Sequence, residues 1–148
     1  MLNRAHMNQI RAIQSLREAQ ANTARDAFVV AQRERESAIH VRDEQLALRD
    51  TAHGTWNRLL GADRPNPSLV RLSGAWLLSQ QSRLDTEELN LSVAENRRGH
   101  AGELHGQALA REAAAKKTYA QVQRTMENYL EERQSAQLID ALLLRHRK

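Results

Sequence analysis

The chain contains no cysteine, only two prolines and few aromatic residues, and each of these shortages narrows what it can be. Without cysteine there is neither a disulfide nor a thiolate metal site, and a reducing cytosol is the natural setting. Aromatic residues make up 3% of the 148 residues, and much of the 41% hydrophobic fraction is alanine. Large apolar side chains are the main material of a globular core. The chain can therefore build a thin apolar seam, but not a thick core.

Long apolar runs are also missing, and positive charge does not follow one face. No run approaches the ~20 apolar residues that span a bilayer. The net charge of +4 comes from 22 basic and 18 acidic side chains, and three of the positive charges lie in the last four residues. Elsewhere the signs are mixed, as on a solvated coiled coil, whereas a DNA-binding protein normally carries a basic stripe. We therefore expect a cytoplasmic protein with no membrane span and no nucleic-acid partner.

Both prolines, Pro65 and Pro67, lie in one short stretch that divides the chain. A proline inside a helix costs about 3 kcal/mol and moves the preceding residue out of the helical region. The flanking segments are rich in Ala, Leu, Gln, Glu and Arg, which are good helix formers. We expect an all-α fold, a long antiparallel two-helix coiled-coil hairpin. Its single elongated domain would consist of a first helix at 2–60, a turn at 61–66 and a longer second helix at 67–147.

Residues at the turn are expected to end one helix and begin the next. Asn66 suits the N-cap of the second helix, with Pro67 at its first position, where the missing N–H costs nothing. Gly61 stands where a C′ glycine would end the first helix. Three more glycines lie close together in the second segment: Gly99, Gly102 and Gly106. Each costs up to ~1 kcal/mol in a helix, so this segment either bends, breaks or continues as a weakened helix.

Seven-residue repeats predict which surfaces of the two helices meet, because such a repeat indicates a left-handed supercoil. In the second segment one row is apolar or aromatic throughout: Ala94, Ala101, Ala108, Ala115, Val122, Tyr129, Ala136 and Leu143. Its companion row is apolar near the turn and more polar beyond it: Leu77, Leu84, Leu91, Arg98, His105, Glu112, Tyr119, Met126, Arg133 and Asp140. The first segment offers two weaker rows: Ala24, Ala31, Ala38, Gln45 and Ala52, and Ala27, Glu34, Val41, Leu48 and Thr55.

Part of the second segment has no counterpart in the first. Folding at about residue 63 pairs position i with roughly 127 − i, so residues from about 126 onward are left over. These residues include several large apolar side chains: Tyr129, Leu130, Leu138, Ile139, Leu142, Leu143 and Leu144. An unpaired apolar stripe on a solvated helix indicates an intermolecular contact. A shifted first helix, a fold-back or pairing with a second copy are the alternatives.

No constellation of residues points to catalysis. The chain has no phosphate-binding or dinucleotide-binding glycine motif, no HExxH and no GxSxG. His100 and His105 are five residues apart, about 140° around a helix, whereas zinc ligands favour a spacing of three or four. We therefore expect a non-enzymatic protein with no catalytic residue, no cofactor and no metal.

Two groups of residues are the candidate partner-binding sites. Near the turn the candidates are Trp56, Leu59, Leu60, Leu69, Leu72 and Trp76. Tryptophan is enriched at interface hot spots, although these side chains would also close the hairpin as a small local core. At the far end of the second segment the candidates are Tyr129, Leu138, Leu142, Leu143, Arg145 and Arg147. Basic residues there also suit the dipole at a helix C-terminus.

In its architecture the chain resembles the FliJ/YscO/HrpO group, the central-stalk proteins of flagellar and injectisome type III secretion systems. The resemblance rests on two long charged helices, one short proline-containing turn, the lack of cysteine and the longer second helix. The stretch Gln9–Arg17 near the start and the stretch Trp56–Leu60 before the turn also fit this group.

The resemblance implies an antiparallel coiled coil similar to the rotor stalk of rotary ATPases. The end with both termini would insert into the pore of a hexameric secretion ATPase, with Tyr129–Lys148 as the inserted segment. The turn would face the membrane export gate or secretion chaperones. Two other functions stay open: a generic coiled-coil scaffold or chaperone, and a basic helical nucleic-acid binder, whose DNA binding would fall steeply with salt.

Overall fold

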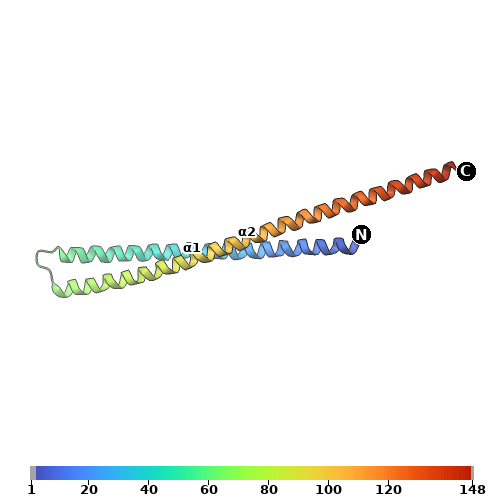
Figure 1. Ribbon diagram of the computed structural model, residues 1–148. Coiled ribbons are helices and arrows are strands. Elements are labelled where there is room, and N and C mark those ends of the chain that lie inside the picture. The colour runs from blue at the N-terminus through green and yellow to red at the C-terminus, as the bar shows by residue number, and fades with distance from the viewer. Residues whose placement is uncertain (1–2, 148) are drawn as a thin grey trace. The chain divides into compact units, whose positions relative to one another are not determined.

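The computed structural model describes residues 3–147 as two long α-helices packed against each other in an antiparallel hairpin (Figure 1). Helix α1 spans Arg4–Leu60 and helix α2 spans Pro67–His146. The second helix is the longer one, with 80 residues against 57. These bounds confirm the all-α hairpin and the turn between residues 61 and 66. The expected first residue of the hairpin, Leu2, lies outside the described residues.

Side-chain caps explain where the helices begin. The Asn66 Oδ1 atom accepts hydrogen bonds from the backbone N–H of Ser68 at 3.0 Å and of Leu69 at 3.4 Å, which confirms Asn66 as the N-cap of α2. Asn3 caps α1 in the same way, since its Oδ1 accepts from the His6 N–H at 2.8 Å. Gly61 follows the last residue of α1 and donates to the Asn57 carbonyl at 3.0 Å. No described glycine has a positive φ, so Gly61 ends α1 without the left-handed conformation.

Helix α2 passes through its glycine cluster without a break. Gly99, Gly102 and Gly106 all lie within the continuous helix Pro67–His146. A break, one of the three alternatives, is therefore wrong. Of these three glycines only Gly102 is in close contact with α1, because a Cβ atom there would lie 3.2 Å from Cε2 of Phe28.

Contacts divide the chain into two units, each with a stretch of α1 against a stretch of α2. The turn unit is Asp26–Glu103, and the terminal unit is Met1–Arg25 with Leu104–Lys148. The buried apolar residues of the described part are few and mostly small: Ala31, Ala52, Leu84, Leu91 and Ala94 in the turn unit, and Ala21 in the terminal unit. Among the described residues no large side chain is less than 2% exposed. The core is therefore a thin seam, as the composition predicts.

Both repeats of α2 face the seam as predicted, but only as far as Met126. The row from Ala94 to Val122 and the companion row from Leu77 to Met126 are buried or half-buried at every seventh position. Beyond Met126 the same rows continue as Tyr129, Arg133 and their successors, and these residues are exposed.

One of the two rows predicted for α1 is wrong. The row Ala24, Ala31, Ala38, Gln45 and Ala52 lies in the seam. Of the second row only Thr55 is half-buried, while Ala27, Glu34, Val41 and Leu48 are exposed. The seam instead uses the positions one residue later: Phe28, Arg35, Arg42, Arg49 and Trp56. The two largest side chains of α1 thereby enter the seam, and arginine stems cover it while their charged heads stay at its edge.

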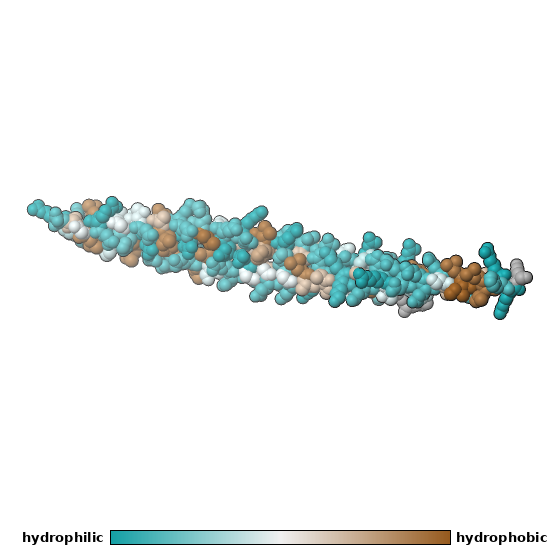
Figure 2. Space-filling model, turned by 90° about the horizontal axis from the view of Figure 1, so that it is seen from above, coloured by the Kyte–Doolittle hydropathy of each residue, from teal (hydrophilic) through white to brown (hydrophobic). Residues whose placement is uncertain are grey.

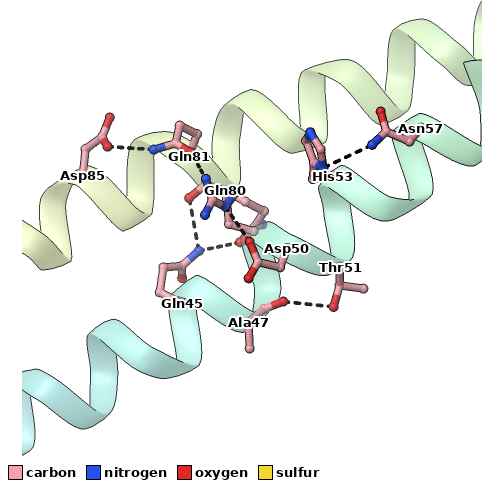
Figure 3. A network of polar contacts seen from close by, with 10 residues as sticks. Gln45, Ala47, Asp50, Thr51, His53, Asn57, Gln80, Gln81 and Asp85 are labelled. Carbon is pink, nitrogen blue, oxygen red and sulfur yellow. Dashed lines mark hydrogen bonds and ion pairs between the residues drawn. The ribbon is translucent and has the colours of Figure 1, made fainter.

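A polar network crosses the seam of the turn unit where the alanine row is interrupted (Figure 3). The Gln45 amide donates to Oε1 of Gln80 at 2.7 Å, and Arg49 donates to Oε1 of Gln81 at 3.0 Å. Gln45 thus interrupts the apolar row as predicted, with its amide paired. Further from the turn, Arg35 and Glu95 form an ion pair at 3.8 Å. A polar pair inside the seam, such as Gln45 with Gln80, fixes the register of a coiled coil at some cost in stability.

Two aromatic side chains of α1 pack onto glycines of α2 in the turn unit. A Cβ atom added at Gly74 would lie 3.2 Å from Nε1 of Trp56, and Phe28 occupies the corresponding place beside Gly102. The guanidinium of Arg98 lies over the Phe28 ring at 5.7 Å from its centroid. Position i therefore lies opposite roughly 130 − i, whereas folding at about residue 63 predicts roughly 127 − i. The predicted relation places Trp56 opposite position 71, which is less than one helical turn from Gly74.

Candidate partner-binding surfaces

An apolar groove next to the turn brings together four of the six residues predicted there. The groove has a volume of about 390 Å³ and is lined by Thr55, Leu59, Leu69, Leu72, Ser73 and Trp76. Leu72 is 69% exposed and Leu69 is 48% exposed, so the rim of the groove lies open to solvent. Both helices contribute, because α1 supplies Thr55 and Leu59 and α2 supplies the others. A groove of this kind can accept an apolar side chain or one face of a helix.

The two remaining predicted residues of this end lie outside the groove. Trp56 is half-buried in the seam against Gly74, where it closes the hairpin. Leu60, at the last position of α1, is 44% exposed but does not line the groove. The two tryptophans therefore have different places: Trp56 belongs to the seam, and Trp76, which is 39% exposed, belongs to the open groove.

Two lining residues of the groove were not predicted from the sequence. Thr55 and Ser73 are small and polar, and nothing in their chemistry marks them as binding residues. Their spacing is the signal that could have identified them. Thr55 precedes Leu59 by four residues and Ser73 follows Leu69 by four, which places each pair on one helix face. The Ser73 Oγ atom is buried and has no hydrogen-bond partner among the described residues.

The second candidate surface is the end of α2 beyond the reach of α1, which we call the tail, residues 127–147. Every residue of the tail is exposed. Its large apolar side chains are exposed to between 47% and 67%: Tyr129, Leu130, Leu138, Ile139, Leu142, Leu143 and Leu144. The prediction that residues from about 126 onward lack a counterpart in the first helix is therefore confirmed. Figure 2 shows apolar surface gathered near the C-terminal end of the chain, followed by polar atoms.

Apolar side chains lie on opposite sides of the tail helix. Leu138 follows Tyr129 by nine residues, or about 2.5 turns, so the two side chains point in opposite directions. Leu142 lies near the side of Leu138, and Leu143 near the side of Tyr129. The window Leu138–Leu144 contains one polar residue, Asp140. A helix that is apolar all round is normally buried on all sides.

Basic residues follow the apolar window directly. Arg145 and His146 lie in the last turn of α2, where positive charge interacts favourably with the helix dipole. Arg147 follows the helix and is exposed, and Lys148 lies outside the described residues. The predicted terminal residues are thus all accessible, with the apolar ones ahead of the basic ones.

The acidic and histidine side chains of the described residues are spread along the two helices. Across residues 3–147 there is no group of three or more His, Asp or Glu side chains that could hold a metal ion. The pKa of Lys116 is raised by its hydrogen bond and ion pair with Glu112 at 2.8 Å and, less strongly, by Glu18. Neither helix, as far as it is described, has a stretch long and apolar enough to cross a membrane.

No family model, no curated protein and no solved structure matches the chain.

Proposed function

We propose that the chain is a non-enzymatic stalk and adaptor of a type III secretion export apparatus, of the injectisome or the flagellar kind. In this role it would lie on the cytoplasmic side, peripherally attached to the membrane-bound apparatus. It would link the hexameric secretion ATPase to the export-gate protein, with secretion chaperones as further partners. The proposal rests on the architectural resemblance to the FliJ/YscO/HrpO group and on one observation, the exposed tail that is apolar on opposite sides.

The apolar tail supports a partner that surrounds it. A groove on a flat surface covers one side of a helix and would leave Leu138 and Leu142 exposed when Tyr129 and Leu143 are covered. A socket formed by several subunits covers all sides at once, and the pore of a hexameric ring is such a socket. Burying one leucine side chain contributes about 1.5–3 kcal/mol. Two leucines on one side of the tail therefore change the affinity for an enclosing partner by roughly a hundredfold or more.

The apolar groove at the turn supports a second partner, separate from the partner of the tail. Its residues belong to the turn unit and the tail belongs to the terminal unit, so the two surfaces share no residue. An adaptor that links two proteins requires two separate binding surfaces. In the proposed function the tail binds the ATPase and the groove binds the export gate or a chaperone.

The experiment mixes the purified chain with the secretion ATPase of the organism that encodes it and measures complex formation and ATP hydrolysis. We expect the unmodified chain to bind the hexamer and to stimulate hydrolysis. The variant Leu138→Glu with Leu142→Glu should lose both effects. Leu89→Glu is the matched control, because Leu89 is 66% exposed but belongs neither to the tail nor to the groove. The groove variant Leu72→Glu should keep both effects. Absence of binding and of stimulation by the unmodified chain would refute the proposal.

A further inference from the structure

The face that α2 turns toward α1 continues into the tail, where α1 no longer covers it. Up to Met126 this face consists of the two seven-residue rows of the seam. In the tail one row continues as Tyr129, Ala136 and Leu143, and the other continues as Arg133 and Asp140. All five residues are exposed. The tail thus has the pattern of a coiled-coil seam without a partner helix.

Two opposite charges on this face indicate what the partner is. Arg133 and Asp140 lie seven residues apart, on the same side of the helix and about 10 Å from each other along its axis. Neither forms an ion pair with another residue of the part that the structure describes. In a parallel pair of tails like charges would meet, Arg133 with Arg133 and Asp140 with Asp140. In an antiparallel pair each Arg133 meets the Asp140 of the other chain, twice by symmetry.

We propose that the free protein forms a dimer in which the tails of two copies pair antiparallel through this face. The second copy then takes the place that α1 has further along α2, and it has the same antiparallel direction as α1. Polar residues within a coiled-coil seam specify how its helices align. The two Arg133–Asp140 pairs select the antiparallel orientation here.

The apolar residues of the tail fit the same register. When Arg133 lies opposite Asp140 of the second copy, Tyr129 lies next to Leu143 of the second copy. Ile139 then comes beside Ala136 of the second copy, within one helical turn. Ala136 is the small residue of its row, between Tyr129 and Leu143. A large side chain opposite a small one is the knob-and-hole arrangement of coiled coils.

The dimer goes beyond the proposed function, because it describes the chain before an assembly partner binds. Pairing covers the side of Tyr129 and Leu143 and leaves Leu138 and Leu142 open. A partner that encloses the tail covers all of these residues, so enclosure and pairing exclude each other. The dimer does not depend on the stalk function, and its test uses the purified chain alone.

Sedimentation equilibrium of the full chain and its charge variants tests the dimer. The unmodified chain should show a reversible monomer–dimer equilibrium. Arg133→Asp and Asp140→Arg should each weaken dimerisation about tenfold or more, because both symmetric pairs change from attraction to repulsion. The double variant, with both substitutions, should dimerise like the unmodified chain, since the pairs are restored in reverse. Glu131→Arg is the matched control on the far side of the tail and should leave the equilibrium unchanged.

Disulfide crosslinking is a second test of the orientation. Because the chain has no native cysteine, only the introduced cysteines can form a disulfide. A chain with Arg133→Cys and a second chain with Asp140→Cys should form a disulfide when mixed, and neither should form one alone. A disulfide needs Cα atoms within about 7 Å, which antiparallel pairing gives only to the mixed pair. Circular dichroism confirms that each variant stays helical. A monomer at all concentrations, or disulfides in the separate chains, would overturn the proposal.

Discussion

Close contact between Phe28 and Gly102 leads to a prediction that separates three neighbouring glycines. Replacing glycine by alanine inside a helix stabilises it by about 0.8–1 kcal/mol. At Gly99 and Gly106 an added Cβ atom would meet nothing within 4 Å, so alanine should give the full gain there. For a chain of this length 1 kcal/mol corresponds to a rise of about 3 °C in Tm.

Gly102 should behave differently although it lies in the same helix. Its added Cβ atom would lie 3.2 Å from Cε2 and 3.6 Å from Cδ2 of Phe28, and the first distance is shorter than the ~3.5–4.0 Å of a relaxed carbon contact. The ring is held in place by the guanidinium of Arg98, 5.7 Å from its centroid. An extra carbon in a packed site costs about 1 kcal/mol or more. The gain and the cost nearly cancel, so we expect Gly102→Ala to leave Tm almost unchanged.

Thermal unfolding followed by circular dichroism measures all three variants under the same conditions. The double variant Phe28→Ala with Gly102→Ala isolates the contact, because removing the ring should restore the helix-propensity gain of the second substitution. We therefore expect a coupling energy of about 1 kcal/mol between the two positions. The reasoning is wrong if Gly102→Ala raises Tm as much as Gly99→Ala does, or if the coupling energy is zero.

Two further predictions concern the seam and an ion pair. Leu84→Ala should lower the free energy of unfolding by about 2 kcal/mol, which is the lower end of the range for a buried leucine, because a thin seam can collapse around the gap. Leu89→Ala should change the free energy of unfolding by less than about 0.5 kcal/mol. Leu84 is 2% exposed and Leu89 is 66% exposed, and an equal loss in urea unfolding would contradict the thin-seam description. Glu112→Gln should lower the pKa of Lys116 toward its ordinary value in an NMR titration, because the Glu112 hydrogen bond is the main cause of the raised pKa. Since folding raises that pKa, any stabilisation from the pair is present at neutral pH and is lost as the pH rises through the pKa of Lys116. An unchanged pKa in the Glu112→Gln variant would show that Glu112 is not the cause.

Much of the fold can be predicted from the sequence, because a few residues are compatible with only one position in a helical hairpin. Two prolines and one asparagine fix the turn and the start of α2. In α2 one repeat is apolar at every seventh position, so its buried face is determined without knowledge of α1. The tail follows from the unequal lengths of the two helices. None of these inferences needs a long-range contact.

The second row of α1 could not be predicted in the same way, because a coiled-coil row has a neighbour three residues away and another four residues away. One choice contains Val41 and Leu48, and the other contains Arg42 and Arg49. Hydropathy favours the first choice, but the structure has the second, in which Phe28 and Trp56 reach glycines of the opposite helix. The glycines thus determine which row of α1 faces the seam, and they lie on α2. The groove at the turn was incompletely predicted for a related reason, since Thr55 and Ser73 line it only after the helices are aligned.

Glycine and aromatic positions also explain why the turn unit has one register although its seam is repetitive. A slip of seven residues moves one helix by roughly 10 Å and again places alanines near alanines, so the small residues alone discriminate weakly between registers. Phe28 and Trp56 are four repeats apart, and Gly74 and Gly102 are also four repeats apart, so both aromatic–glycine contacts form together. A slip in one direction places Glu95 opposite Phe28 and Pro67 opposite Trp56, whereas a slip in the other direction places Leu109 and Gln81 there. Both alternatives press an aromatic ring against a side chain and separate Gln45 from Gln80. The glycines that weaken α2 locally are therefore the residues that let the two helices meet in a single alignment.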